Sequence, residues 1–222
     1  SRFCRKLAGR PALPLATAAQ VPFIAPFTGA QALRDPFNRF AFHVRASYFD
    51  ETAEIVKQVT SIGAKRIAVF HQNDSYGKAG LDGVLRALKP LNLEPAALGT
   101  VERNTVDVAA AVKSILAGKP DAIVQISAYK SCAAFIREAR KAGFGGTFYN
   151  VSFVGTKALA DELGADARGV IISQVMPYPY SPVSPLSSEY LAAGKAADGE
   201  KFEPNYSSIE GFVAAKTFSE AM

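Results

Sequence analysis

The sequence has few of the residues from which catalytic and metal sites are commonly built. Its 222 residues include two cysteines, Cys4 and Cys132, and two histidines, His43 and His71. Two distant cysteines have neither the spacing of a zinc site nor that of a redox-active Cys-x-x-Cys motif. Neither histidine is accompanied by a serine or cysteine at the spacing of a known nucleophile motif. We therefore predict that the chain is not an enzyme and that it uses no metal ion or cofactor.

Long apolar runs and nucleotide-binding glycine patterns are also missing. No stretch of 18 or more apolar residues occurs, so no segment reads as a membrane span. No glycine-rich phosphate-binding pattern follows a predicted strand, which argues against a nucleotide cofactor. The formal net charge of +5 is small for this length, and the basic residues are mostly spread singly along predicted helices. That distribution is typical of solvated helix faces and does not indicate nucleic acid binding.

The sequence does contain a regular alternation of strand-like and helix-like segments. Short apolar runs predict strands at 65–70, 122–126, 147–151 and 170–175. Continuous apolar runs of this length are typical of strands buried on both faces of a parallel sheet. Apolar residues recur at helical spacing between the strands, as in 55–62 and 108–116. The order β-α-β-α-β-α-β predicts an α/β fold with a parallel sheet.

Two segments interrupt this alternation. A strand-like stretch at 40–45 precedes the first clear helix, and a run with four prolines at 176–185 follows the last strand. Because proline fits neither a helix interior nor a sheet interior, the proline-rich run is predicted to be a connector. If both interruptions are crossings between lobes, residues 47–179 form one lobe. Residues 1–46 and 180–222 then belong together in another.

Polar and aromatic residues follow the carboxyl ends of the predicted strands. In open α/β sheets, ligands bind in the crevice outside those ends. Hydroxyl groups, aromatic rings and helix N-termini placed there suit a small anion such as a carboxylate. The candidate ligand-binding residues are Phe27, Thr28, Gly29, Tyr76, Tyr129 and Ser152.

Several residues in this region also have purely structural interpretations. Asp74 or Ser75 could cap a helix, and Gly77 could serve a turn or close packing. Tyr76 and Tyr129 could be packing residues. The default interpretation of both histidines is structural, and that of Cys132 is a buried structural thiol.

At these residues the sequence resembles periplasmic type I solute-binding proteins of the branched-chain amino acid class. The similarity covers roughly residues 13 to 222 and rests on the order and spacing of several short segments. These segments are 21–30, 42–48, 66–77, 143–144 and 176–179. The resemblance implies a Venus-flytrap fold, in which two lobes each contain a doubly wound parallel sheet.

The resemblance also implies a function. Such proteins are periplasmic solute-binding components of ABC importers and deliver their ligand to a membrane permease. The ligand here would be an amino acid or a related small carboxylate, held in the cleft between the lobes. The family's first-lobe loop, which binds the ligand carboxylate, is matched by Phe27, Thr28 and Gly29. Its second-lobe aromatic residues are matched by Tyr76 and Tyr129.

The chain departs from the family pattern in two ways. Amino-acid binders carry an acidic residue that pairs with the ligand ammonium, and the matching position here is Ser152. Because a buried ammonium without a charge partner is costly, a carboxylate that lacks the amine is favoured. The chain is also shorter than those of the family, so we expect a fragment with an incomplete first lobe. In such a fragment Phe212, Val213 and Phe218 would form an exposed apolar patch.

Two other functions stay open at this point. The same fold serves as the ligand-sensing domain of receptors and transcriptional regulators, although the sequence shows neither a helix-turn-helix motif nor a membrane segment. An enzyme of doubly wound type would need a nucleophile, a phosphate loop or a metal cluster, and the sequence shows none of these.

Overall fold

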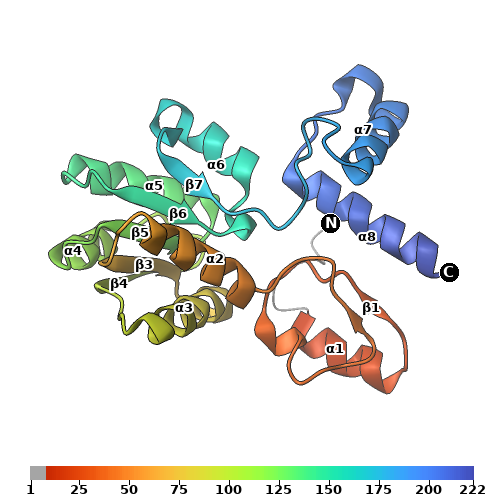
Figure 1. Ribbon diagram of the computed structural model, residues 1–222, viewed down its shortest axis with the longest axis horizontal. Coiled ribbons are helices and arrows are strands. Elements are labelled where there is room, and N and C mark those ends of the chain that lie inside the picture. The colour runs from red at the N-terminus through yellow and green to blue at the C-terminus, as the bar shows by residue number, and fades with distance from the viewer. Residues whose placement is uncertain (1–8) are drawn as a thin grey trace. The chain divides into compact units, whose positions relative to one another are not determined.

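The computed structural model describes residues 9–222, which fall into two compact units (Figure 1). Unit 2 spans Ser47–Ser173, and unit 1 combines the described residues up to Ala46 with Gln174–Met222. Residues 174–179, which the sequence analysis assigned to the second lobe, therefore group with unit 1. The reason is packing, because Met176 lies in an apolar cluster with Tyr190 and Ile209 of that unit.

Unit 2 is built around a five-stranded sheet of order β4-β3-β5-β6-β7, in which all neighbouring strands are parallel. The strands are β3 (Ile67–Gln72), β4 (Ala97–Val101), β5 (Ala122–Ile126), β6 (Thr147–Asn150) and β7 (Val170–Ile172). In the central pair, Ile67 lies beside Ala122 and His71 beside Ile126. Every residue of β3 and β5 is buried, as expected for strands covered on both faces. The predicted α/β class with a parallel sheet is thereby confirmed.

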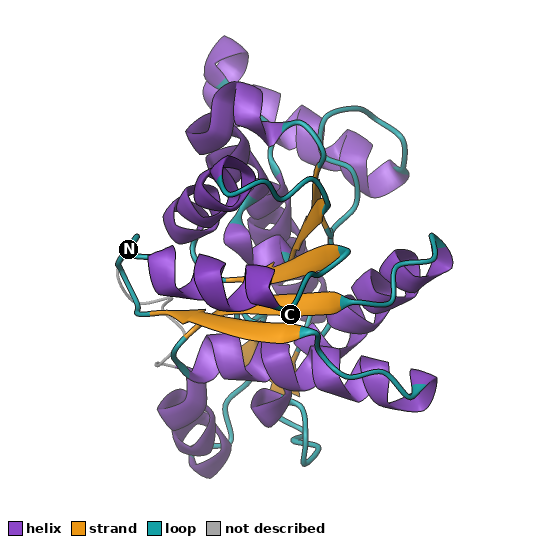
Figure 2. Cartoon of the chain, turned by 90° about the vertical axis from the view of Figure 1, so that its left-hand side faces the viewer, coloured by secondary structure: helices purple, strands orange, loops and turns teal. Residues whose placement is uncertain are grey.

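Helices cover both faces of this sheet (Figure 2). They are α2 (Tyr48–Ser61), α3 (Ser75–Leu88), α4 (Ala109–Ala117), α5 (Tyr129–Lys141) and α6 (Thr156–Leu163). Ile126 of β5 faces Gly80 of α3, whereas its neighbour Gln125 donates a hydrogen bond to the Cys132 carbonyl of α5. Because successive strand residues point to opposite faces, α3 and α5 lie on opposite sides of the sheet. Helix α2 packs on α3, and α4 and α6 pack beside α5.

Strand β4 and the exposure of Ile62 differ from the sequence-based predictions. Strand β4 lies at the edge of the sheet, where Leu98 is 43% exposed and Val101 is buried. Its apolar residues are interrupted by Gly99, at which a Cβ atom would lie 2.9 Å from Ile115 of α4. An edge strand with this alternation lacks the continuous apolar run that revealed the inner strands. Ile62, predicted on the buried stripe of α2, is exposed because the helix ends at Ser61.

Local contacts explain where α2 and α3 begin. The Ser47 hydroxyl accepts the N–H of Asp50, and the Asp50 carboxylate accepts the N–H of Ser47, which closes a capping box. At α3, the Asp74 carboxylate accepts the N–H groups of Tyr76 and Gly77, so Asp74 is the predicted cap. A Cβ atom at Gly77 would lie 1.8 Å from the carbonyl oxygen of Gln72, which confirms the close-packing interpretation of this glycine.

Unit 1 contains helices and a two-stranded parallel sheet. Its elements are α1 (Gly9–Ala18), β1 (Phe23–Ile24), β2 (Ala41–Phe42), α7 (Pro185–Asp198) and α8 (Tyr206–Ala221). Strand β2 lies within the strand-like stretch predicted at 40–45, and its pairing with β1 places Phe23 beside Ala41. Among the described helices of the chain, none is long and apolar enough to cross a membrane.

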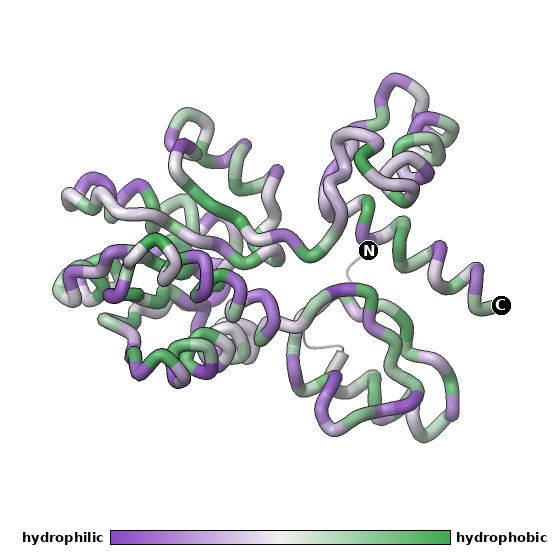
Figure 3. The backbone as a smooth tube through the Cα atoms, in the orientation of Figure 1, coloured by the Kyte–Doolittle hydropathy of each residue, from purple (hydrophilic) through white to green (hydrophobic). Residues whose placement is uncertain are grey.

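The apolar core of unit 1 forms between the connector, α7 and α8. Hydrophobic and hydrophilic residues alternate along α8 (Figure 3), and the apolar ones include Ile209, which is fully buried. The ring of Tyr190 meets that of Phe212 at 5.8 Å. Phe212 and Val213, which we expected to be exposed, are therefore partly buried against this core. Phe218 is exposed, as expected.

A buried ion pair ties the N-terminal part of unit 1 to α8. Arg45 Nη1 lies 3.4 Å from Glu210 Oε1, and the two side chains are 2% and 8% exposed. The Arg45 guanidinium also lies 5.2 Å from the ring centre of Phe27. Removing one member of a buried pair leaves the other charge without compensation, so this contact is a critical point of unit 1.

We expect Gly77→Ala to lower the free energy of unfolding by about 1–3 kcal/mol, because the new methyl group collides with a backbone carbonyl. Urea unfolding followed by far-UV circular dichroism measures the change. Gly145→Ala is the matched control, since a Cβ atom there would meet nothing within 4 Å. Equal stability of the two variants would contradict this expectation, because it would show that the backbone at 72–77 can move to accommodate a methyl group.

Glu210→Gln should destabilise the chain by about 3–5 kcal/mol, because Arg45 then stays buried without its negative partner. The control is Glu220→Gln on the same helix, whose side chain is 65% exposed and pairs with Lys216 at the surface. Chemical unfolding of both variants under the same conditions tests this expectation. A loss no larger than that of the control would contradict it.

Candidate functional site

The strand order places a topological switch point between β3 and β5. Strand β3 is followed by α3 and β5 by α5, and these two helices leave the sheet toward opposite faces. In open α/β sheets, ligands bind outside the carboxyl ends of the strands at such a point. The rule therefore predicts a ligand-binding site at the carboxyl edge of the unit 2 sheet. Tyr76 and Tyr129 follow the two strands concerned.

Tyr76 lies in a row of three aromatic rings at this edge. Its ring centre is 5.4 Å from that of Tyr48, at the start of α2, and 5.2 Å from that of Phe153, which follows β6. Both contacts are tilted, an arrangement that aromatic pairs favour. Tyr76 is only 3% exposed. The structure thus brings Tyr76 close to the segment of Ser152, while its contact with a ligand stays a prediction.

Tyr129 is the first residue of α5 and is partly buried. The residue before it, Ala128, provides no side-chain cap for the helix. The Ser131 hydroxyl instead donates to the Ala128 carbonyl at 2.9 Å and lies 2.7 Å from the Ser127 hydroxyl. The positive end of the α5 dipole consequently faces the switch point without a capping carboxylate.

The N-terminus of α3 behaves differently from the sequence-based expectation. Helix N-termini at the strand ends were predicted to suit an anion, but the Asp74 carboxylate already accepts the first N–H groups of α3. A second anion at that end would meet the negative charge of Asp74. Of the two helices that flank the switch point, α5 is therefore the one suited to an anionic group.

Ser152 begins a short 3-10 turn (Ser152–Val154) after β6 and contacts an acidic residue that the sequence analysis did not identify. Its backbone N–H donates to Glu51 Oε1, and the hydroxyl of Ser173, just after β7, donates to the same oxygen at 2.6 Å. Glu51 is 5% exposed and belongs to the buried face of α2, together with Tyr48 and Ile55. An acidic residue on an otherwise largely apolar stripe was the signal that could have revealed it.

In unit 1, the three predicted residues Phe27, Thr28 and Gly29 follow β1 in a tight loop. Ala25, at the start of this loop, has a φ of 48°, a left-handed conformation that is uncommon for a residue with a side chain. The Thr28 N–H donates to the Pro26 carbonyl at 2.7 Å, and the Thr28 hydroxyl accepts the N–H of Ala30 at 3.2 Å. Strained backbone of this kind persists where the surrounding contacts hold it.

Two arginines hold that loop in place. Arg34 donates to the carbonyl oxygens of Arg45, at 2.9 Å, and Ala46, at 3.3 Å, and a nitrogen of the same side chain lies 3.5 Å from the Thr28 carbonyl. Arg45 in turn covers the ring of Phe27. The loop at 26–29 is thus fixed by cationic side chains, as an anion-binding loop would be. The ligand-binding roles of Phe27, Thr28 and Gly29 stay predictions.

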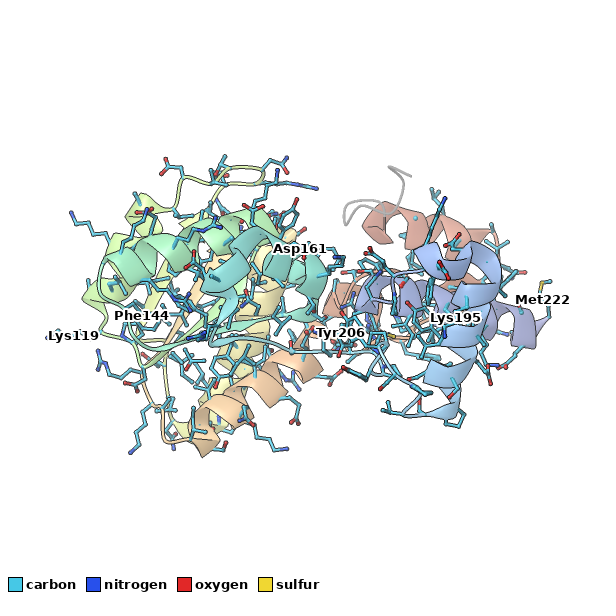
Figure 4. The ribbon with its side chains drawn as sticks, turned by 90° about the horizontal axis from the view of Figure 1, so that it is seen from above. Lys119, Phe144, Asp161, Lys195, Tyr206 and Met222 are labelled. Carbon is cyan, nitrogen blue, oxygen red and sulfur yellow. The ribbon has the colours of Figure 1, made fainter. Side chains whose placement is uncertain are left out.

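A second aromatic row lies in unit 1, on the proline-rich connector. Tyr178 and Tyr180 make an edge contact at 5.3 Å, and Tyr180 meets Tyr206 at 5.9 Å (Tyr206 is labelled in Figure 4). Burial raises the pKa of Tyr206, and the two neighbouring tyrosines add to the rise. The Tyr206 hydroxyl therefore stays protonated at neutral pH and acts as a hydrogen-bonding group.

A surface groove of about 380 Å³ lies between α2 and α3, lined by residues that include Phe49, Val56 and Arg86. The Arg86 guanidinium lies 5.3 Å from the ring centre of Phe49. The six candidate residues are not part of its lining. This groove is formed by the helix surfaces, and its position does not match the carboxyl edge where the candidate residues of unit 2 lie.

The residues that were interpreted as structural are found in structural positions. Cys132 is fully buried in α5 with a free thiol, whereas Cys4 lies outside the described residues. His71 is buried at the end of β3, with Nδ1 3.1 Å from the Gln72 carbonyl. His43 Nε2 lies 3.1 Å from the Leu33 carbonyl. Within the described part of the chain, no group of three or more His, Cys, Asp or Glu side chains could hold a metal ion.

Comparison with known families gives one match over nearly the whole chain. Residues 7–222 match the family described as periplasmic binding protein. This is a family of binding proteins and not of enzymes, in agreement with the expectation from the sequence. No significant match was found among curated proteins.

Solved structures support the same assignment. A possible leucine/isoleucine/valine-binding protein from Rhodopirellula baltica is 34% identical, with a TM-score of 0.90, and the match covers 98% of this chain and 60% of that one. A substrate-binding periplasmic protein from Ralstonia solanacearum is 32% identical, with a TM-score of 0.84 and coverages of 95% and 60%. The chain therefore spans about 60% of the length of these relatives.

A more distant solved structure shows similarity to this chain in fold alone. It is a branched-chain amino acid ABC transporter protein from Thermus thermophilus with bound valine, 18% identical, with a TM-score of 0.84 and coverages of 98% and 57%. The expected type I periplasmic-binding-protein fold, partly covered by this chain, is thus confirmed.

Protonation of His43 should destabilise the chain. Burial lowers the pKa of His43 below its ordinary value of 6.5, repulsion from Arg34 lowers it further, and the Leu33 carbonyl opposes the shift. The unfolded state then binds the proton more tightly, so stability is retained above pH 6.5 and is lost as the pH falls below that value. Urea midpoints between pH 5.5 and 7.5 should show this slope, and His43→Gln should flatten it. An unchanged slope in the variant would assign the effect to another group.

Proposed function

Because the chain belongs to the periplasmic binding protein family, we propose that it functions as the solute-binding component of an ABC importer. Its ligand is an amino acid or a related small carboxylate. The observation that carries the proposal is the carboxyl edge of the unit 2 sheet, where aromatic residues and one uncapped helix N-terminus meet the switch point between β3 and β5. The proposed location is the periplasm, and the proposed partner is a membrane permease.

The candidate residues of unit 1 are suited to a carboxylate in this proposal. In the loop of Phe27, Thr28 and Gly29, the Thr28 hydroxyl and backbone N–H groups other than that of Thr28 bind a carboxylate, because the Thr28 N–H already donates to the Pro26 carbonyl. The positions of Arg34 and Arg45 support this, because the two guanidinium groups fix the loop. A small anion needs such a rigid set of donors, since a mobile loop would lose conformational entropy on binding.

The candidate residues of unit 2 form an apolar and aromatic surface suited to a ligand side chain. Tyr129 stands at the first turn of α5, and Ser152 begins the turn after β6. Tyr76 supports this surface from its position between Tyr48 and Phe153. Pockets for small ligands combine apolar and aromatic walls with a few fixed polar groups, and these residues provide both.

Isothermal titration calorimetry of the full chain tests the proposal. The probes are L-leucine, L-valine and L-phenylalanine with their amine-free counterparts, 4-methylpentanoate, 3-methylbutanoate and 3-phenylpropanoate. We expect at least one probe to bind and Tyr129→Ala to weaken its binding about tenfold, the equivalent of about 1.4 kcal/mol. Thr28→Ala should weaken binding of amino acid and amine-free acid alike, because both carry the carboxylate.

The control variant is Ile62→Ala, whose side chain is 62% exposed and lies outside the proposed site. It should bind the probes as the unaltered chain does. Wild-type affinity in both Tyr129→Ala and Thr28→Ala would contradict the assignment of these residues. Failure of all six probes to bind the unaltered chain would contradict the proposed ligand class.

A further inference from the structure

Glu51 of unit 2 is a buried acidic residue with one carboxylate oxygen that accepts no hydrogen bond from the described residues. Its side chain is buried on the first turns of α2, and Oε1 is held by the Ser152 N–H and the Ser173 hydroxyl. Its second oxygen, Oε2, is buried and has no hydrogen-bond donor among the described residues. A buried carboxylate oxygen without a donor costs free energy, so such an oxygen calls for a bound partner.

The surroundings favour a negative charge at this position. Glu51 lies within the first turn of α2, where the positive end of the helix dipole stabilises an anion. The two donors to Oε1 come from the ends of β6 and β7, so the carboxylate is fixed at the carboxyl edge of the sheet. None of the ion pairs recorded for the described residues includes Glu51. Among the described residues, no cationic side chain therefore forms an ion pair with Glu51.

Neighbouring aromatic residues make the position suitable for a cation. Tyr48 lies one turn before Glu51 on the same buried face of α2, and Phe153 directly follows Ser152. Both rings contact Tyr76. Aromatic faces attract ammonium groups, and the attraction is stronger where water is excluded. A buried carboxylate that shares a helix face with Tyr48 and is bonded to the residue before Phe153 has the composition of an ammonium-binding site.

Asp50, the residue before Glu51, is not a comparable partner for a cation. The Asp50 carboxylate accepts the Ser47 N–H at 3.0 Å and the Ser47 hydroxyl at 2.7 Å, and it completes the capping box of α2. Asp50 is also exposed, so water solvates the rest of its carboxylate. Glu51 is thus the acidic residue of α2 that both lies at the sheet edge and is shielded from water.

We infer that Glu51 is the charge partner of a ligand ammonium group and supplies the negative charge that Ser152 lacks. This inference rests on the proposed function and narrows its ligand class to carboxylates that carry an amine, such as α-amino acids. It replaces the preference for amine-free acids that Ser152 suggested from the sequence. Ser152 contributes its backbone N–H, which orients the carboxylate of Glu51 so that Oε2 is left for the ligand.

Calorimetry with matched probes separates this role from a purely structural one. The probes are L-leucine against 4-methylpentanoate and L-phenylalanine against 3-phenylpropanoate, each titrated into the full chain. We expect the unaltered chain to prefer the amine in at least one pair by about tenfold or more. Glu51→Gln, which keeps the shape and removes the charge, should lose about tenfold or more for the amino acid. Its affinity for the amine-free acid should change less than about threefold.

Two further variants make the result specific. Ser173→Ala removes a hydrogen bond that ties Glu51 to the sheet but leaves the charge, so the preference for the amine should persist. Glu54→Gln alters an acidic residue of the same helix whose side chain is 73% exposed, and it should bind every probe as the unaltered chain does. Far-UV circular dichroism confirms that each variant is folded before titration.

The outcomes distinguish the two proposals. Equal losses for the amino acid and the amine-free acid in both Glu51→Gln and Ser173→Ala would assign Glu51 a structural role and overturn the inference. An unchanged preference for the amine in Glu51→Gln, or a preference of the unaltered chain for amine-free acids, would also overturn it and leave the proposed function standing. No binding of any probe by the unaltered chain would overturn the proposed function, and the role of Glu51 with it.

Discussion

The pairing of β3 with β4 on one side and β5 on the other is the constraint on which unit 2 depends. Because β3 has a neighbour on each side, the chain must leave it toward β4 and later return to pair β5 with its other edge. The helices after β3 and β5 consequently diverge at the carboxyl edge, which is where ligands bind in sheets of this kind. The buried register, with Ile67 beside Ala122 and His71 beside Ile126, fixes the positions of Tyr76 and Tyr129 along that edge.

At this edge, structural and ligand-binding demands compete for the same polar groups. The first N–H groups of α3 are used by Asp74, which makes the helix start rigid and removes it as an anion site. The start of α5 lacks such a carboxylate and keeps its dipole available. Only one carboxylate oxygen of Glu51 has a structural role. Oε1 ties α2 to the ends of β6 and β7, whereas Oε2 has no hydrogen-bond donor among the described residues. This partial use allows a structural carboxylate to serve also as a binding group.

Unit 1 depends on its arginines in a comparable way. Arg34 and Arg45 hold the loop of Thr28 through carbonyl oxygens and an aromatic ring, and Glu210 compensates the buried charge of Arg45. A buried ion pair is costly to desolvate and still more costly to break. The loop at 26–29 is therefore coupled to α8, although these segments lie far apart in the sequence. A change in α8 would consequently reach the candidate carboxylate loop.

The sequence by itself determined the features that arise from short-range patterns. Continuous apolar runs identified β3, β5, β6 and β7, and residue type limited the helix cap to Asp74 or Ser75 and the role of Gly77 to a turn or close packing. The tertiary structure decided the rest. Strand β4 escaped recognition because an edge strand needs no continuous apolar run, and the burial of Phe212 depended on a partner in α7. The position of Glu51 at the sheet edge is decided by its contacts with Ser152 and Ser173, which are more than 100 positions away in the chain. Local periodicity carries no information about contacts of that range, since they form only when the strands close the sheet.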